Sequence, residues 1–380
     1  MTHVFVVDQT TFKYHLEYLF AGTGAQGKTS PFLVNASAPY VKNVFSNSSE
    51  RMLVGMIADI SRIRVNDKVI FYLQSYNNNP GRFYGVFKAS SIPFFDENDS
   101  NNYLVNQTQK GLSFRILIEP DEVYAKGVTE HDYLDSLKGK KHPSDLCWSL
   151  IYRKLKGNRG CTMIMDYEYD DLIYKIRNIN GNQRLNGPYF SFDATNNIII
   201  NSSVNHVYQG RRNSIDILPR LLYKSGKKNA FETHLQAYLT KNIDNPNICN
   251  LFIPYPNLDC WIGNEVSCGV GMQRIDLMLK QETDDEVVIR LIELKDESPY
   301  IQILDQISWY LEWLSDYVIP KYTRKKIRVI PTIVANGIMP QPVLNAYQNF
   351  NYTISGVNVE PLQYIGFNIV SGGINFTKYL

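Results

Sequence analysis

The stretch VVIRLIELKDES, residues 287–298, joins a run of aliphatic residues to a charged end. Its β-branched and aliphatic residues predict a buried strand. Glu293 and Lys295 end that strand, and because they are two residues apart their side chains lie on one face. A carboxylate and an ammonium at the end of a core strand need a chemical reason, since burying charge is costly.

The segment before this strand supplies an acidic partner for Glu293. RIDLMLK (residues 274–280) and EVVIRLIELK (residues 286–295) flank the polar run QETDD. An antiparallel hairpin centred on that run would pair Asp276 with Glu293 across the two strands. Two facing carboxylates repel each other unless a hard cation lies between them. The sequence therefore predicts a Mg²⁺ site at this end of the hairpin, with Mn²⁺ able to substitute.

Lys295 would share the face of Glu293 and add a positive charge to the site. Its ammonium could orient or help deprotonate an attacking water, or neutralise charge on a phosphate. Two carboxylates, a divalent cation and a lysine are together suited to cleaving a phosphodiester bond. A solvated Glu–Lys ion pair would be the simpler reading of Glu293 and Lys295 taken alone.

The order Asp276, then Glu293-Leu-Lys295, resembles the motif of the PD-(D/E)XK nuclease superfamily. Ile275 stands where that motif has proline. The resemblance covers residues 226–380 and implies a restriction-endonuclease-like mixed sheet with flanking helices. It also implies a metal-dependent endodeoxyribonuclease.

Two flanking features extend this resemblance. Glu232, in FETHL, looks like the helical glutamate that many members add to the metal site. Gln306 and Tyr310, in DQISWYLEWL, are similar to the Gln-xxx-Tyr motif of RecB-like members, and their spacing puts them on one helix face. The implied metal ligands are Asp276, Glu293 and Glu232. The implied catalytic set is Asp276, Glu293, Lys295, Glu232, Gln306 and Tyr310.

Composition limits the class of protein. The 380 residues are 44% hydrophobic and 20% charged, which suits two globular domains. The net charge is only +2, so any surface that binds nucleic acid must be local. Five cysteines form no CxxC pair, which favours free thiols in a reducing compartment over a zinc site. The start of the chain does not resemble a signal peptide and no apolar run is long enough to span a membrane, so we expect a cytoplasmic protein without a membrane partner.

The front of the chain predicts a small barrel with helices over residues 1–178. Its central segment, DKVIFYLQSYNNNPGRFYGVFKASSIPF (residues 67–94), reads as two strands with Gly85 permitting a bulge. This segment resembles the central hairpin of the YTH and EVE domains of the PUA-like superfamily. FLVNASAPYVKNVF (residues 32–45) would form one wall of their ligand pocket, and residues 147–176 are similar to the closing part of EVE domains.

Such domains hold a nucleobase between aromatic walls, so the resemblance implies a reader of a base that is extruded from a duplex. The candidate walls are Tyr40, Tyr84 and Trp148, with Asn35 at the base edge. YTH domains would have tryptophan where Asn35 stands. Arg159, in KGNRG, is a candidate phosphate contact. Each aromatic ring is also typical of a packed core, and Arg159 of a solvated turn.

Residues 179–225 are expected to connect the two domains. The run NINGNQRLNGP is loop-like, and a strand or hairpin follows it. Basic residues dominate residues 211–228, where Arg211 and Arg212 could contact phosphate. A solvated linker explains the same charges.

The expected elements of residues 226–380 alternate helices with strands. KNAFETHLQAYLTKN predicts an amphipathic helix, and CNLFIPYP (residues 249–256) reads as a strand. Residues 298–320 predict a long helix, residues 326–336 a strand, and a further helix leads to a last strand in LQYIGFNIV.

Taken together, the residues favour a restriction-type endonuclease that acts on double-stranded DNA carrying a modified base. Cutting both strands needs two active sites, so a homodimer is expected. A repair nuclease for single-stranded or branched DNA, a binding protein with an inactive nuclease fold, and a role on RNA are alternatives.

Overall fold

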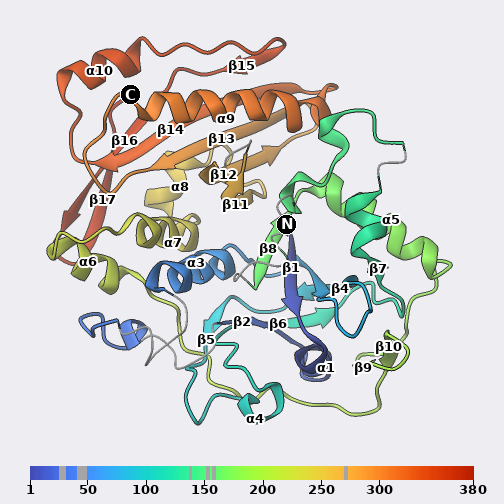
Figure 1. Cartoon of the computed structure of the whole chain (residues 1–380). Coiled ribbons are helices and arrows are strands. Elements are labelled where there is room, and N and C mark those ends of the chain that lie inside the picture. Colours follow the sequence, from blue (N-terminus) through green and yellow to red (C-terminus); the bar gives the residue numbers. More distant parts are fainter. Residues whose placement is uncertain (25–30, 41–48, 137–138, 151–154, 156–159, 269–272) are drawn as a thin grey trace. The chain divides into compact units, whose positions relative to one another are not determined.

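The computed structural model describes every residue of the chain except 25–30, 41–48, 137–138, 151–154, 156–159 and 269–272 (Figure 1). The chain divides into two compact units. The first comprises residues 1–139 and 149–216, and the second comprises residues 140–148 and 217–380. The first contains a curled half-barrel sheet and the second a mixed sheet with helices, which agrees with the predicted mixture of helices and strands.

Eight strands form the sheet of the first unit: β1 Thr2–Val7, β2 Phe20–Thr23, β3 Lys68–Leu73, β4 Arg82–Ala89, β5 Phe94–Phe95, β6 Phe114–Pro120, β7 Val128–Thr129 and β8 Cys161–Ile164. Their order is β2-β6-β4-β3-β1-β8, with β5 beside β6 and β7 beside β4. β1 and β3 are parallel, and the other pairs are antiparallel. The described helices are α1 Gln9–Glu17, η1 Pro31–Leu33, α3 Glu50–Ser61, α4 Val105–Thr108, η2 His131–Asp135 and α5 Asp166–Ile179.

The predicted hairpin of residues 67–94 is present as β3 and β4. Val69 pairs with Phe87 and Phe71 pairs with Tyr84, so β4 holds one more residue than β3 between these pairs. Gly85 lies in this irregular part of β4, where the sequence permits a bulge or a close approach of the backbone. The bulge re-aims the strand and increases its local twist, as the curled sheet requires.

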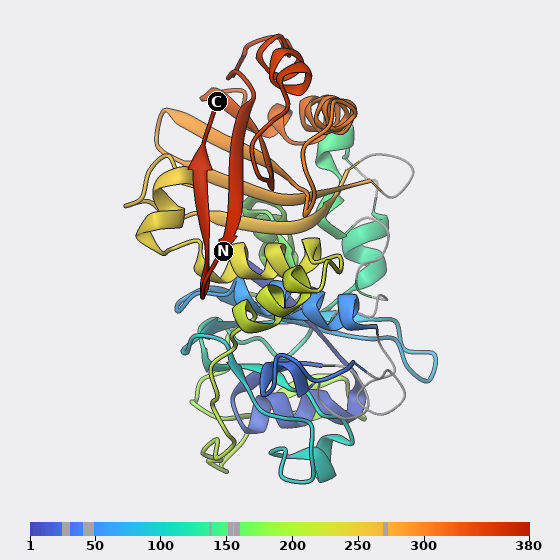
Figure 2. The ribbon, with the colours of Figure 1, turned by 90° about the vertical axis from the view of Figure 1, so that its left-hand side faces the viewer.

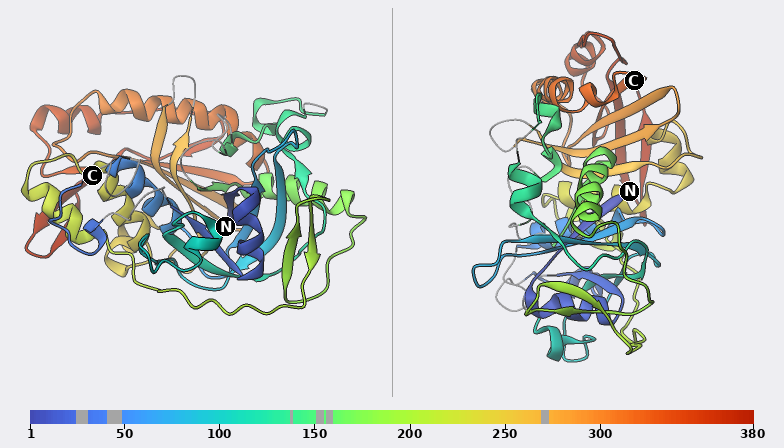
Figure 3. Two further views of the ribbon diagram at one scale, coloured as in Figure 1. Left: turned by 60° about the horizontal axis from the view of Figure 1, so that its bottom comes forward. Right: turned by 90° about the vertical axis from the view of Figure 1, so that its right-hand side faces the viewer.

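A second hairpin lies within the residues expected to form a linker. Its strands, β9 (Phe190–Asp193) and β10 (Ile198–Asn201), are antiparallel. The hairpin packs against α1, where the Phe192 and Phe12 rings lie 4.8 Å apart (Figure 3). Residues 179–216 therefore belong to the first unit, and residues 217–225 to the second.

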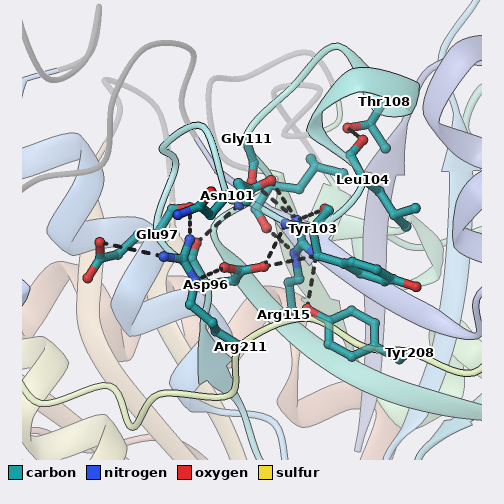
Figure 4. Close-up of polar contacts among 12 residues, drawn as sticks. Asp96, Glu97, Asn101, Tyr103, Leu104, Thr108, Gly111, Arg115, Tyr208 and Arg211 are labelled. Carbon is teal, nitrogen blue, oxygen red and sulfur yellow. Dashed lines mark hydrogen bonds and ion pairs between the residues drawn. The ribbon is translucent and has the colours of Figure 1, made fainter.

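Buried charges hold the loop after β5 against the chain near residue 210 (Figure 4). Arg115 of β6 has no exposed surface and donates to the Tyr208 hydroxyl at 2.9 Å. Its guanidinium lies 3.5 Å from the Asp96 carboxylate, which also accepts from Nε of Arg211 at 2.7 Å. Arg211 donates further to both oxygens of Asp99. This network fastens two segments that are more than a hundred residues apart in sequence.

Seven strands form the sheet of the second unit: β11 Trp261–Ser267, β12 Arg274–Glu282, β13 Glu286–Leu294, β14 Lys326–Asn336, β15 Val357–Val359, β16 Gln363–Val370 and β17 Gly373–Lys378. The order is β11-β12-β13-β14-β16-β17, with β15 beside β14. β14 is parallel to β13, β15 and β16, and the remaining pairs are antiparallel. The pair β16–β17 forms one edge of the sheet (Figure 2).

Helices accompany this sheet: α6 Leu218–Gly226, α7 Glu232–Asn242, α8 Pro246–Phe252, α9 Ile303–Tyr317, η5 Ile319–Tyr322 and α10 Gln341–Gln348. Phe231, Leu235 and Leu239 are buried, as the predicted apolar face of α7 requires. α9 lies along the sheet and packs on β13 (Figure 1).

One predicted strand of the second unit is wrong. CNLFIPYP was expected to be a strand, but its first four residues end α8. The helix begins earlier, where the Asn245 side chain accepts from the backbone N–H of Asn247 and Pro246 occupies the first turn. These helix-start signals lie outside the apolar run that suggested a strand. The sequence reading also missed β11 and β17.

Residues 140–148 belong to the second unit although their neighbours on both sides belong to the first. The short helix η3, Pro143–Asp145, packs with α9. Asp145 forms an ion pair with Lys321 at 2.5 Å, and the ring centroids of Trp148 and Trp313 lie 4.8 Å apart in an edge-to-face arrangement. Among the described residues, no helix has both the length and the apolar composition needed to cross a bilayer.

Replacing Asp96 by Asn should destabilise the first unit by about 3 kcal/mol, because the buried Arg115 charge loses its ionic partner. Asp99→Asn is the matched control. Its half-exposed carboxylate also pairs with Arg211, so the loss should be about 1 kcal/mol or less. Both variants are unfolded in urea. The unfolding transition followed by far-UV circular dichroism should move to lower urea concentration in Asp96→Asn. The transition followed by tryptophan fluorescence should not move, because all four tryptophans lie in the second unit. Equal losses for the two variants would contradict this account.

Candidate active site

The hairpin of β12 and β13 brings two carboxylates to the same end of the sheet. Leu277 pairs with Ile292, and the antiparallel register continues to Glu282 opposite Val287. This is the register predicted from the sequence. One position beyond the Leu277–Ile292 pair, Asp276 of β12 lies beside Glu293 of β13 with both side chains on one face.

Both oxygens of the Glu293 carboxylate accept hydrogen bonds. The side chain is only 2% exposed. Its Oε1 accepts from Nζ of Lys295 at 2.5 Å, and its Oε2 accepts from the Tyr310 hydroxyl at 2.8 Å. That hydroxyl also lies 2.8 Å from the backbone oxygen of Arg274. Tyr310 therefore fixes the orientation of Glu293 and fastens α9 to the start of β12.

Asp276 is half-buried and has one oxygen available. Its Oδ2 accepts from the backbone N–H of Leu294 at 2.8 Å, which ties β12 to β13 beyond their regular ladder. No described residue donates a hydrogen bond to Oδ1. An unshared carboxylate oxygen beside a second carboxylate is what a hard cation requires.

Lys295 joins the helix α7 to the sheet. Its Nζ lies 3.6 Å from Oε2 of Glu232, the first residue of α7, in addition to its contact with Glu293. The structure thus brings Asp276, Glu293, Lys295 and Glu232 into one cluster. The ammonium neutralises part of the charge of the three carboxylates.

Two further residues hold α7 in place, and the sequence reading missed both. The Asp296 carboxylate accepts from the backbone N–H groups of Phe231 and Glu232, the latter at 3.2 Å, and so caps the start of α7. One turn later, the buried Gln236 amide donates to the backbone oxygen of Asp276 at 2.7 Å. The helix that carries Glu232 is therefore bonded to β12 and to the chain just after β13.

Gln306 is the predicted catalytic residue that does not join the cluster. It is half-buried on α9, one turn before Tyr310, and its side chain makes no hydrogen bond to a described residue. Helical spacing puts Gln306 and Tyr310 on the same side of α9, but only the hydroxyl of Tyr310 reaches a carboxylate.

The charges of the cluster perturb one another. Burial, together with the neighbouring Glu293 and Glu232 carboxylates, raises the pKa of Asp276 well above its usual value. Burial opposes the charged form of Lys295, but the Glu293 and Glu232 carboxylates outweigh it and raise the pKa of the ammonium. Burial and the charges of Glu293 and Asp276 also raise the pKa of the Tyr310 hydroxyl, which stays protonated and donates.

The cluster fits a divalent cation held by two carboxylates. In the part of the chain that the structure describes, no group of three or more His, Cys, Asp and Glu side chains is arranged to hold a metal ion. Glu232, expected as a third ligand, lies toward Lys295 instead. Mg²⁺ commonly takes one or two carboxylates and keeps several waters. The Oδ1 atom of Asp276 and the Glu293 carboxylate could supply that set, and a cation there would relieve the repulsion that raises the pKa of Asp276.

Comparisons with known proteins assign the chain to no family. No protein-family model matches the chain, and no curated protein matches its sequence. The nuclease resemblance expected from the sequence therefore rests on the residues themselves, and above all on the pairing of β12 with β13.

Two of the predicted base-binding residues, Tyr84 and Trp148, are buried. Tyr84 has no exposed surface, packs against Phe12 and donates to the backbone oxygen of Asn197, so no ring face is open to a base. Trp148 is 1% exposed and belongs to the second unit rather than to the predicted reader. Aromatic rings of a core and of a pocket look alike in sequence, which explains both corrections.

Two candidate base contacts remain at the surface. The exposed Asn35 accepts from the backbone N–H and the hydroxyl of Ser37, and so stabilises its own turn. Tyr40 is half-buried, with its ring 6.5 Å from that of Phe32.

The candidate phosphate contacts have different outcomes. Arg159 lies outside the described residues. Arg211 is bound to Asp96 and Asp99 within the first unit, so its guanidinium serves the fold rather than facing a phosphate. Arg212 is exposed, near the rings of Phe94 and Tyr208.

Asp276→Asn should stabilise the protein in the absence of divalent ions at about pH 8, by roughly 1 kcal/mol, the amount that one pKa unit represents. Asn keeps an acceptor for the Leu294 N–H while one repelling charge is removed. Because the folded pKa of Asp276 is raised, wild-type stability is greatest below the ordinary carboxyl pKa and falls as pH rises through the folded value. The two proteins should therefore converge near pH 4 when unfolding is followed by tryptophan fluorescence. Addition of Mg²⁺ should raise the Tm of the wild type only, and a rise in the variant would contradict the metal assignment.

Asp296→Ala should destabilise the second unit by about 1–2 kcal/mol, since the start of α7 loses the acceptor for two N–H groups. Asp296→Asn keeps an acceptor and should recover most of that loss. Urea unfolding followed by tryptophan fluorescence measures both. If Asn were as harmful as Ala, the charge rather than the cap would be the source of the effect.

Proposed function

We propose that this protein is a metal-dependent endodeoxyribonuclease of the restriction type, with a nuclease unit that resembles the PD-(D/E)XK superfamily. One observation supports this above the others: Asp276, Glu293 and Lys295 meet at the end of β12 and β13, in the register that the motif needs. The mixed sheet with α7 before the hairpin and α9 after it suits the restriction-endonuclease-like fold.

In this proposal Asp276 and Glu293 hold one Mg²⁺, for which Mn²⁺ can substitute. The bound ion would polarise the scissile phosphate and lower the pKa of a water. Lys295 stays protonated at neutral pH because its pKa is raised, so it would neutralise phosphate charge rather than act as a general base. Tyr310 keeps Glu293 oriented by donating to it. In the hydrolysis, a P–O bond forms to the water oxygen and the P–O bond to the leaving sugar oxygen breaks.

The first unit would select the substrate. Its curled sheet, with the bulged β3–β4 hairpin, is compatible with a PUA-like barrel of the EVE or YTH type, and such domains bind nucleobases. The substrate would be double-stranded DNA with a modified base. Cutting both strands calls for two active sites, and a homodimer would provide them.

Digestion of one plasmid, prepared with and without adenine or cytosine methylation, tests the function. With Mg²⁺ present the wild type should cut methylated plasmid. Lys295→Met keeps the apolar stem but removes the ammonium, and should reduce the rate by about 10²-fold or more. Lys378→Met, at an exposed position of β17, is the matched control and should cut like the wild type.

The possible results separate the alternatives. Undiminished cutting by Lys295→Met would remove the catalytic assignment. Equal cutting of all plasmids would remove the recognition of a modified base, and faster cutting of flapped or single-stranded DNA would favour a repair nuclease. A protein that binds DNA without cutting it, and whose Tm ignores Mg²⁺, would be a binding protein with a nuclease-like fold.

A further inference from the structure

The first unit contains a polar groove that has no part in the site described above. Its volume is about 930 Å³. One wall is the C-terminal half of α5, a second is η2, and the turn between β9 and β10 closes one end. The start of β4 and the chain leading into β7 complete the lining.

Hydrogen bonds fix these walls to one another. The Asn180 side chain, just after α5, accepts from the backbone N–H of Lys126 at 2.9 Å and donates to its backbone oxygen at 2.9 Å. At the other end, the Tyr84 hydroxyl donates to the backbone oxygen of Asn197 at 2.8 Å. The groove is therefore formed before any ligand arrives, which reduces the entropic cost of binding.

The cations of the groove are available to an anion. Neither Lys126 nor Lys175 has an ionic or hydrogen-bonding partner for its ammonium among the described residues. Arg82 donates through one terminal nitrogen to the backbone oxygen of Gly127 at 3.1 Å, while its buried Nε has no hydrogen-bond partner there. These three positive charges surround one hollow.

The acidic groups of the groove, in contrast, are engaged with neighbours. The Asp132 carboxylate accepts from the Thr129 hydroxyl at 2.6 Å. The Asp135 carboxylate lies 2.8 Å from Nδ1 of His131. The lining therefore carries three cations (Arg82, Lys126 and Lys175) and two hydrogen-bonded carboxylates, so its formal charge is +1 with His131 neutral. An incoming anion is favoured at the unpaired ammonium groups rather than beside the carboxylates.

An aromatic ring and amides accompany the cations. Tyr174 is 63% exposed and lines the groove from α5, next to Lys175 and one turn from Asn178. An exposed ring can stack on the face of a base, and amide groups can bond to its edge. Cations that bind phosphate, a ring that stacks and amides that read an edge are together typical of a nucleic-acid site.

We propose that this groove binds a single strand of nucleic acid, with its phosphates at Lys126 and Lys175 and an unpaired base on Tyr174. The inference deepens the proposed function, because it locates a surface of the first unit that would hold an unpaired segment of the duplex substrate, such as the strand around an extruded base. It rests on that function for the choice of a nucleic acid over another phosphorylated ligand. It also places the reader on different residues from those that the sequence suggested.

Binding of a fluorescein-labelled oligonucleotide of about 12 nucleotides, measured by fluorescence anisotropy with the full chain in EDTA, tests the proposal. Lys126→Glu and Lys175→Glu should each weaken binding about tenfold at low salt and reduce the slope of log affinity against log salt by about one. Lys13→Glu is the matched control, because Lys13 is a half-exposed lysine of α1 away from the groove, and its effect should be small.

A second variant separates stacking from charge. Tyr174→Leu should weaken binding about fivefold or more, since stacking on an aromatic ring is lost. The same variant should bind an abasic oligonucleotide as well as the wild type does. Unlabelled mononucleotide should compete only weakly, and DNA and RNA strands are compared in parallel to identify the source.

Several results would overturn the proposal. They are absence of binding by the wild type, charge reversals no more harmful than Lys13→Glu, equal loss of abasic binding in Tyr174→Leu, and a mononucleotide that competes as well as the strand. Because EDTA prevents metal-dependent cutting, the assay is independent of the nuclease site. A chain that binds through the groove but cuts nothing would contradict the proposed function alone, and a chain that cuts but ignores these variants would contradict the groove alone.

Discussion

The antiparallel register of β12 and β13 sets the position of every charged group in the candidate active site. Side chains alternate between the faces of a strand, so a slip of one residue would move Glu293 and Lys295 away from the face of Asp276. The buried pairs of the hairpin, such as Leu277 with Ile292, oppose such a slip because it would expose apolar surface. The hydrogen bond from the Leu294 N–H to the Asp276 side chain also stabilises this register.

The helices of the site depend on that register in turn. α9 is bonded to the hairpin through the Tyr310 hydroxyl, which contacts both Glu293 and the backbone oxygen of Arg274 at the start of β12. α7 is bonded to β12 through Gln236, and to the chain just after β13 through Asp296, which accepts two backbone N–H groups. A site built in this way is preorganised by ordinary secondary structure, while its like charges remain unfavourable in the free protein. Clusters of repelling charges of this kind, which lower stability locally, are typical of sites that perform chemistry.

Sequence periodicity predicted those parts of the structure that depend on local pattern. The pairing of Asp276 with Glu293 followed from the length of the polar turn between two strands, and the bulge at Gly85 from a glycine within a strand. The start of α8 was missed because an apolar run outweighed the Asn245–Pro246 helix signal. Tertiary contacts left no local signal. Asp296 caps a helix 65 residues away in sequence. The sequence around Trp148 does not reveal whether that ring lines a pocket or is buried in a core.

The detour of residues 140–148 into the second unit affects how the chain could be divided. A fragment that begins at residue 217 would lack the Trp148 ring and leave the buried Trp313 uncovered on that side. After a single proteolytic cut at residue 216, we expect the amino-terminal fragment to stay bound to the carboxy-terminal fragment. The amino-terminal fragment contains residues 140–148, which pack within the second unit. The second unit is therefore not encoded by one continuous segment of the sequence. Its residues 140–148 are translated before residues 149–216 of the first unit.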